Sequence, residues 1–154
     1  MRRPTPVIVL VTLAAFLAAC SNENDPYLKI GGGGFIFNYR LANAMLGVLV
    51  VAPRSLPEGG TVEVSLTNPA GGAPLVQREV IAANESQFDF RFETLTGIEK
   101  NVDYVATVRL IGADGKTIET IERVYRSDID QAATMPDKPL TVGPGYTPNP
   151  ETSH

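Results

Sequence analysis

The chain contains few of the side chains that most enzymes use for catalysis. Its 154 residues include one cysteine and one histidine, and that histidine, His154, is the last residue. A serine or cysteine nucleophile needs a base held beside it, and a histidine at the chain end supplies no such pair. A zinc site needs several His or Cys ligands. The composition therefore predicts a protein that is not an enzyme and has no metal and no cofactor.

Basic clusters, disulfides and long hydrophobic runs are also missing. The formal net charge is −4 with no cluster of Lys or Arg, which argues against nucleic acid and against electrostatic binding to anionic lipid. A lone cysteine forms no disulfide within the chain, so stability has to come from a packed core. The longest apolar run, residues 7–19, is shorter than the ~20 residues that span a bilayer as a helix.

The chain begins with an export signal. Arg2 and Arg3 precede the apolar run, which ends in small residues, as in a secretory signal peptide. Leu17-Ala-Ala-Cys20 closely resembles the bacterial lipobox. The resemblance implies that the Cys20 thiol receives a diacylglyceryl group, that residues 1–19 are removed, and that the new amino group is usually acylated. A twin-arginine signal and a retained membrane helix are the alternatives.

The predicted lipid would attach the protein firmly to a membrane, because two or more acyl chains hold a protein stably where one does not. Loss of Arg2 and Arg3 leaves eleven basic and seventeen acidic residues, a net charge of −6. In enterobacterial lipoproteins an Asp after the cysteine favours the inner membrane. The lipid on Cys20 therefore predicts a lipid-anchored, periplasm-facing protein of the cell envelope. Ser21, which stands where that Asp would be, favours the outer membrane over the inner membrane.

Composition divides the chain after the signal into three parts. Residues 20–33 are predicted to be the lipidated Cys20 and a flexible tether that ends in the glycine run 31–34. A phosphate loop is the alternative for this run, but no helix start and no lysine follow it in register. Residues 34–126 are predicted to form one domain, and residues 127–154 a Pro/Gly-rich tail.

The domain is predicted to consist of short β-strands. Residues 45–52 are apolar on both faces, which suits a buried central strand, and Asp114-Gly115 favours a hairpin turn followed by a bulge near Glu119. Other segments alternate with period two, and Glu63 is placed on a solvent-facing side. The apolar sets expected to face the core are Val62, Val64 and Leu66; Phe88, Phe90 and Phe92; and Val102, Tyr104, Ala106, Val108 and Leu110.

These segments together predict an all-β fold. Six to seven short strands without a long helix favour a small antiparallel β-sandwich of the fibronectin-like kind. Tyr104 is interpreted as a structural residue whose hydroxyl bonds back to the preceding chain. The tail is expected either to run extended along the sandwich with Leu140 and Val142 tucked in, or to hang free and offer Tyr146 to a partner. Partial packing is favoured, with the end beyond Tyr146 disordered.

The order of four segments resembles the YscW/YbaY-type bacterial lipoproteins. The segments are Leu56-Pro57, Phe88 to Phe92, Tyr104 to Leu110 and Asp114-Gly115-Lys116, and the resemblance covers Leu56 to Arg126. It implies a β-sandwich behind a lipobox. The best-known member of that family is a pilotin, which guides the secretin ring of a type III secretion system to the outer membrane.

The resulting hypothesis is a non-enzymatic, membrane-anchored envelope lipoprotein. Its β-sandwich would bind a protein or help to assemble an envelope or secretion complex, in the manner of a pilotin. The alternative is a lipid-anchored module for a small ligand or a glycan. The expected partners are the membrane, through the lipid on Cys20, and an envelope protein whose identity the sequence does not give. Possible partner contacts are Leu140, Val142 and Tyr146.

Overall fold

The computed structural model describes residues 25–152. Cys20, the predicted signal and residues 21–24 of the predicted tether lie outside the described residues. Within residues 25–152, no helix has both the length and the apolar character needed to cross a membrane.

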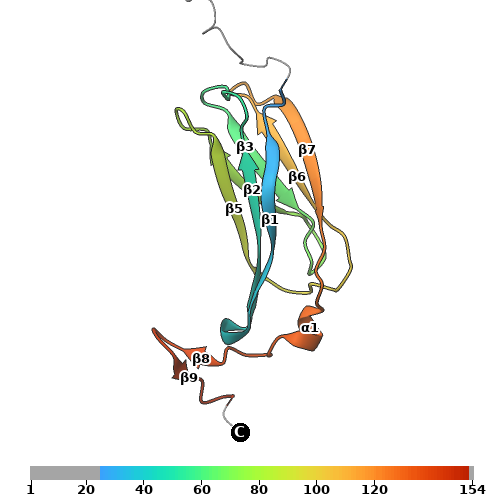
Figure 1. The fold of residues 1–154 in the computed structure, drawn as a ribbon, viewed down its shortest axis with the longest axis vertical. Helices are drawn as coiled ribbons and strands as arrows, with labels where there is room; N and C mark the ends of the chain where they lie inside the picture. Colours follow the sequence, from blue (N-terminus) through green and yellow to red (C-terminus); the bar gives the residue numbers. More distant parts are fainter. Residues whose placement is uncertain (1–24, 153–154) are drawn as a thin grey trace, which may run out of the picture.

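The protein is an antiparallel β-sandwich (Figure 1), as the sequence predicts. One sheet has three strands in the order β1-β2-β5, and the other has four in the order β4-β3-β6-β7. The apolar strand β2 is central in the smaller sheet, also as expected. The strands are β1 (Lys29–Asn38), β2 (Asn43–Val51), β3 (Thr61–Leu66), β4 (Leu75–Val80), β5 (Gln87–Leu95), β6 (Tyr104–Ile111) and β7 (Thr117–Tyr125).

The core lies between the two sheets and follows the alternation in the sequence. The inward sets of β3, β5 and β6 are buried as predicted, except Val102, which precedes β6 and is exposed. Each buried Phe or Leu stabilises the fold by about 1.5–3 kcal/mol. All buried apolar residues of the described chain lie between Leu28 and Tyr125, so removal of residues 1–20 leaves the core complete.

Two further structural predictions are confirmed. The Tyr104 hydroxyl accepts a hydrogen bond from the Glu99 N–H at 2.8 Å and donates one to the Gly97 carbonyl at 3.4 Å, which fixes the corner before β6 as in other sandwiches. Leu110 pairs with Glu119 and Ile111 with Thr117. One residue of β7 is therefore left over, which is the expected bulge.

The glycine run is not a hinge, and the prediction that the domain starts at Gly34 is wrong. Strand β1 begins at Lys29 and includes all four glycines. Gly32, Gly33 and Gly34 pair with β2, and Gly31 lies at a break in the register. Gly33 has φ +134°, and a Cβ there would overlap the Gly47 carbonyl and lie 2.8 Å from the Tyr125 hydroxyl. That hydroxyl donates to the Gly32 carbonyl at 3.1 Å. Glycine is required here because two backbones and a tyrosine meet.

Glu63 faces outward from β3, but it is 1% exposed and not solvated as predicted. The guanidinium groups of Arg78 on β4 and Arg109 on β6 cover its carboxylate, with Arg109 Nε 2.9 Å from Glu63 Oε1. Burial by itself would raise the pKa of Glu63. The hydrogen bonds and charges of the two arginines outweigh burial and hold that pKa below its ordinary value.

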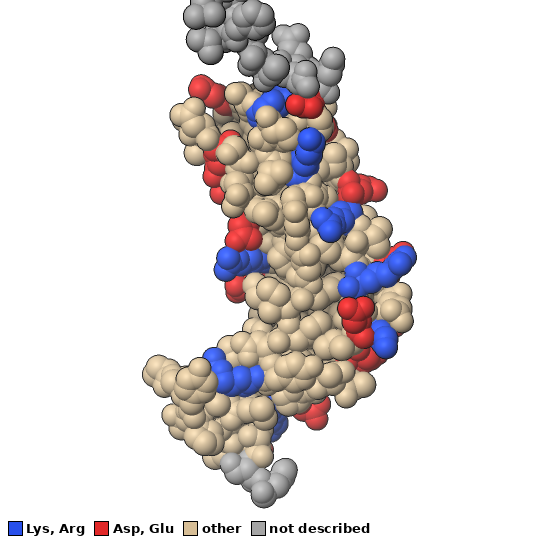
Figure 2. All heavy atoms as spheres, in the orientation of Figure 1, with Lys and Arg blue, Asp and Glu red and all other residues tan. Residues whose placement is uncertain are grey.

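The tail folds back on the tip of the β1–β2 hairpin instead of running along the sandwich. The Leu140 N–H donates to the Arg40 carbonyl at 2.8 Å. The tip and tail contain η1 (Tyr39–Leu41), α1 (Gln131–Thr134), β8 (Thr141–Val142) and β9 (Thr147–Pro148). This end lies opposite the one where the chain enters at Asp25 (Figure 1), and its surface is largely uncharged on the face drawn in Figure 2.

Candidate functional site

A shallow groove opens along one side of the sandwich, between the edge strands β1 and β7. Its volume is about 490 Å³. Strand β1 pairs only with β2, and β7 pairs only with β6, so each presents one unpaired edge of main-chain N–H and C=O groups. We call this feature the β1/β7 groove. It is lined by Pro26, Leu28, Lys29, Ile30, Ile121, Glu122 and Arg123.

Two hydrogen bonds define the length of the groove. Near one end the Leu28 N–H donates to Glu119 Oε2 at 2.8 Å. Near the other end the Tyr125 hydroxyl donates to the Gly32 carbonyl at 3.1 Å. No backbone ladder joins β1 to β7. The two strands are therefore fastened at two points, and the space between those points stays open.

The floor of the groove is apolar. Leu28 is fully buried, and Ile30 and Ile121 are partly buried against the core. Ile121 pairs with Val108, whose side chain points into the core, so Ile121 also points inward. An apolar floor of this kind, open to solvent, favours the side chains of an added segment over water.

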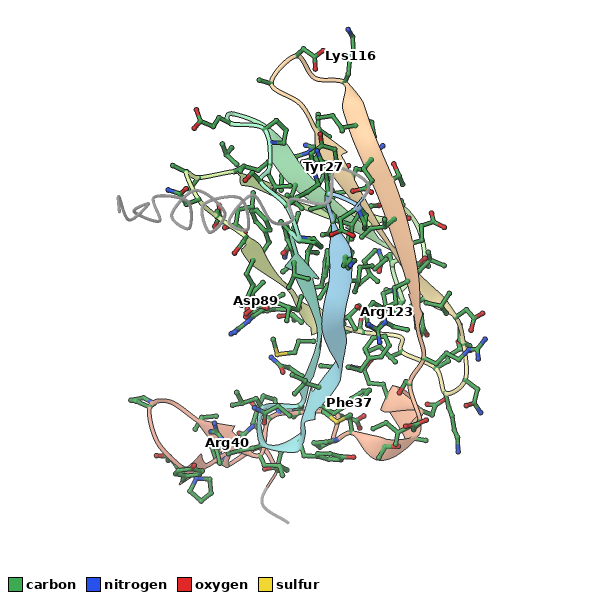
Figure 3. The ribbon with its side chains drawn as sticks, turned by 45° about the horizontal axis from the view of Figure 1, so that its top comes forward. Tyr27, Phe37, Arg40, Asp89, Lys116 and Arg123 are labelled. Carbon is green, nitrogen blue, oxygen red and sulfur yellow. The ribbon has the colours of Figure 1, made fainter. Side chains whose placement is uncertain are left out.

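The rim of the groove is cationic. Lys29 and Arg123 are exposed, and neither forms an ion pair with an acid among residues 25–152. Arg123 lies with its guanidinium carbon 5.4 Å from the centre of the Tyr125 ring, and in Figure 3 it reaches from β7 toward β1. The two acids near the rim are engaged, because Glu119 accepts from Leu28 and Glu122 accepts from the Thr107 hydroxyl.

A second cavity of about 570 Å³ lies at the Asp25 end, between the loops that follow β2 and β4. Its charged side chains have both signs and include Arg54, Glu58 and Glu85. Arg54 stacks on the Tyr27 ring at 4.1 Å and donates to the Asp25 carbonyl at 3.3 Å. Loops form the walls, so this cavity offers no free strand edge, and the β1/β7 groove is the better candidate for a partner segment.

The structure places the predicted contact residues at the opposite end from the groove. Leu140 and Val142 are 45% and 41% exposed, so the prediction that they tuck into the sandwich is wrong. Tyr146 is 80% exposed. The chain beyond it is not disordered up to Thr152, because Asn149 is buried and its amide nitrogen donates to the Pro139 carbonyl at 2.7 Å. Cys20 lies outside the described residues.

The groove was missed because strand phase does not reveal which strands are edges. Ile121 and Arg123 stand two residues apart in a segment whose alternation is broken by the bulge. The sequence pattern that could have identified β7 as an edge strand is an apolar and a charged residue on the same face, because an edge strand often turns a charged side chain inward. Among residues 25–152 no group of three or more His, Cys, Asp or Glu is placed to hold a metal ion.

No protein-family model and no curated protein matches the chain. Several solved structures resemble part of it, and two of them serve as examples. One is a family 76 glycoside hydrolase from a bovine Bacteroides thetaiotaomicron strain, with 11% identity, a TM-score of 0.42, and coverage of 64% of this chain and 20% of that chain. The other is OgpA from Akkermansia muciniphila, with 14% identity, a TM-score of 0.41, and coverage of 70% and 29%. The chain spans less than a third of either protein.

Proposed function

We propose that the protein is a lipid-anchored envelope lipoprotein without enzymatic activity that binds an extended segment of another envelope protein. The observation that carries this proposal is the β1/β7 groove. An added strand can take main-chain hydrogen bonds from a free edge while alternate side chains enter an apolar floor. The groove supplies both features, and its length between the two bridging hydrogen bonds suits a short segment.

The rim defines the chemistry of the partner. Lys29 and Arg123 have no acidic partner among the described residues, and complementary charge improves both specificity and the rate of association. We infer a segment with alternating apolar residues and at least one carboxylate at its solvent-facing positions. The protein as a whole is acidic, so other surfaces would repel such a segment.

The lipid places the groove close to the membrane. Four residues lie between Cys20 and Asp25, and the five residue steps from one to the other reach about 18 Å at most in an extended chain. Because the groove starts at Pro26, its partner would be a membrane-associated protein. A pilotin-like escort to the outer membrane is the role that agrees with the resemblance to YscW/YbaY-type lipoproteins.

The anchor is tested by metabolic labelling with a radioactive fatty acid. The wild-type chain should incorporate the label, and Cys20→Ala should not, because only the thiol accepts the diacylglyceryl group. The variant should also remain as an uncut or soluble precursor. Labelling that persists in Cys20→Ala would overturn the lipobox interpretation.

The groove is tested by photocross-linking in intact cells. A photoreactive residue at position 121 should give a discrete cross-linked envelope protein. The same residue at position 80, which is 68% exposed on the outer face of β4, is the control and should not. Arg123→Glu should abolish the cross-link at position 121, whereas Arg91→Glu on β5 should leave it. Equal products at positions 121 and 80 would contradict the proposal.

A further inference from the structure

The tip of the β1–β2 hairpin and the tail together form a second surface, which we call the distal platform. It consists of Tyr39, Arg40, Leu140, Thr141 and Tyr146. Arg40 holds the platform together: its carbonyl accepts from the Leu140 N–H at 2.8 Å, and its Nη1 donates to the Thr141 hydroxyl at 2.9 Å. Its guanidinium carbon lies 5.0 Å from the centre of the Tyr146 ring. Figure 3 shows Arg40 beside the β8–β9 hairpin.

The hairpin that carries Tyr146 is fixed in place although its tyrosine is exposed. Asn149 donates its backbone N–H to the Leu140 carbonyl at 2.9 Å and its side-chain amide to the Pro139 carbonyl at 2.7 Å. Lys138 and Glu151 form an ion pair at 2.7 Å across the base of the hairpin. Tyr146 is 80% exposed, and the fastened hairpin limits the backbone conformational entropy that is lost when a ligand stacks on its ring.

The neighbours of Tyr146 leave its ring accessible. Gly143 and Gly145 carry no side chains, and a Cβ at either position would meet nothing within 4 Å. The guanidinium of Arg40 lies against the ring, and the rest of the ring faces solvent. Hot spots of protein interfaces sit instead in packed pockets ringed by contacts that exclude water. An open, flat ring suits a flat ligand better than a protein side chain.

The polar groups of the platform suit hydroxyl groups. Residues 139–150 contain no Asp, Glu, Lys or Arg, but they contain Thr141, Tyr146 and Thr147. Arg40 supplies further N–H donors and forms no ion pair with a described acid. Hydroxyls donate and accept, as sugar hydroxyls do, and the C–H face of a pyranose is apolar like the ring.

We propose that the distal platform binds a glycan, a chain of neutral or N-acetylated hexopyranose units, with one sugar stacked on Tyr146 and its hydroxyls bonded to Arg40 and Thr141. This site is separate from the β1/β7 groove. It lies beyond the far end of β1, which extends six residues past Gly32 at the end of the groove, about 20 Å farther along the molecule. If the lipid anchor of the proposed function holds, the platform faces away from the membrane, but the binding itself does not depend on the anchor.

The test uses the form that lacks residues 1–20, whose core is complete. Titration with N-acetylglucosamine oligomers, followed by two-dimensional NMR, should shift the amide signals of residues 39–41 and 140–148. Tyr146→Ala should weaken binding at least about tenfold, since a stacked aromatic contact contributes about that much. Tyr146→Phe should stay within about threefold, because stacking needs the ring more than its hydroxyl. Arg40→Ala should also weaken binding.

Two controls separate this proposal from the proposed function. Arg123→Glu removes a rim cation of the groove and should leave glycan binding unchanged, so failure of one proposal does not imply failure of the other. Val80→Ala controls for loss of an exposed apolar side chain. The proposal is overturned if the shifts are absent, if Tyr146→Ala binds as wild type, or if a photoreactive residue at position 146 cross-links a protein and no cell-wall polysaccharide is retained.

Discussion

The two sides of the sandwich at which edge strands of the two sheets face each other are built differently. On the side where β4 faces β5, Gln77 turns inward and its amide nitrogen donates to the Arg91 carbonyl at 2.7 Å. Glu79 also turns inward, near Glu85 and Asp89, so the charges on this side are acidic. We call it the closed side because the Gln77 side chain lies across it. On the side where β1 faces β7, bridges at two points leave the β1/β7 groove open between them, and its unpaired charges are basic.

The two sides share one feature, which is a polar side chain turned inward on an edge strand. Both edge strands of the larger sheet, β4 and β7, turn polar side chains inward, which discourages uncontrolled pairing of edges. On both sides a polar side chain bonds to the facing strand: Gln77 does so from β4, and Glu119 and Tyr125 do so from β7. Arg123 makes no such bond, and it lies at the rim of the basic, apolar-floored β1/β7 groove between two unpaired strand edges.

The largest expected loss of stability comes from a core residue of β5, the strand of the smaller sheet on the closed side. Phe90, in the middle of β5, is buried between the sheets. Phe90→Ala should lower the free energy of unfolding by about 3–5 kcal/mol, because it leaves a cavity in addition to the lost burial. Urea denaturation of the form lacking residues 1–20 measures this. Ile36→Ala, on a residue 56% exposed on β1, should stay within about 0.5 kcal/mol. Equal losses would mean that the closed side does not pack as described.

The groove side depends on the close approach at Gly33. Gly33→Ala should cost about 2–4 kcal/mol, because its φ is strained for alanine and its Cβ would press on Gly47 and Tyr125. Gly34→Ala is the matched control: a Cβ there meets nothing within 4 Å, so its cost should be within about 0.5 kcal/mol. Similar melting temperatures for the two variants would show that β1 and β7 are not fastened at this point.

The pattern of apolar residues was enough to predict the sandwich, and the reason is physical. Burial on one face of a strand imposes period two, so Phe88, Phe90 and Phe92 revealed their phase without any tertiary information. The Tyr104 corner and the bulge in β7 could also be predicted from the sequence, because each follows from a local pattern.

What the sequence did not reveal depends on neighbours that are distant in the chain. Residues 31–34 were predicted to be a hinge because the strand that pairs with them, β2, and the tyrosine that packs on them, Tyr125, are distant in the sequence. Glu63 was predicted to face solvent because the two arginines that cover it belong to other strands, β4 and β6. The β1/β7 groove needs strands from both ends of the domain, so no local pattern contains it.

The ion pair that fastens the closed-side edge strand gives a smaller effect. Arg78 of β4 and Arg109 of β6 both bind Glu63. Glu63→Gln should lower stability at pH 7 by about 1–2 kcal/mol, a modest value because both arginines are partly exposed. Since the folded pKa of Glu63 lies below its unfolded value, the wild type should lose this advantage as pH falls through the acid range from about 5 downward. An unchanged difference at pH 3 would contradict the assignment.

Substitution of Glu79 is expected to change the free energy of unfolding least, and in the opposite direction to substitution of Glu63. Burial first, and then the charges of Glu85 and Asp89, raise the pKa of Glu79 above its ordinary value. A carboxyl group with a raised folded pKa stabilises the protein at low pH, and this stabilisation is lost as pH rises through the folded pKa.

Glu79→Gln should therefore raise the free energy of unfolding by about 0.5 kcal/mol at pH 7, and the gain should vanish as pH falls through the folded pKa of Glu79, below which the wild-type carboxyl is protonated in the folded protein. Glu93→Gln, on the outer face of β5, removes the same charge from an exposed position and controls for the net acidity of the chain. If both variants gain equally, the acidity of the closed side is only part of the overall negative charge. A gain confined to Glu79→Gln would show that the repulsion is local to the acids between β4 and β5, whereas the unpaired charges on the β1/β7 side are basic.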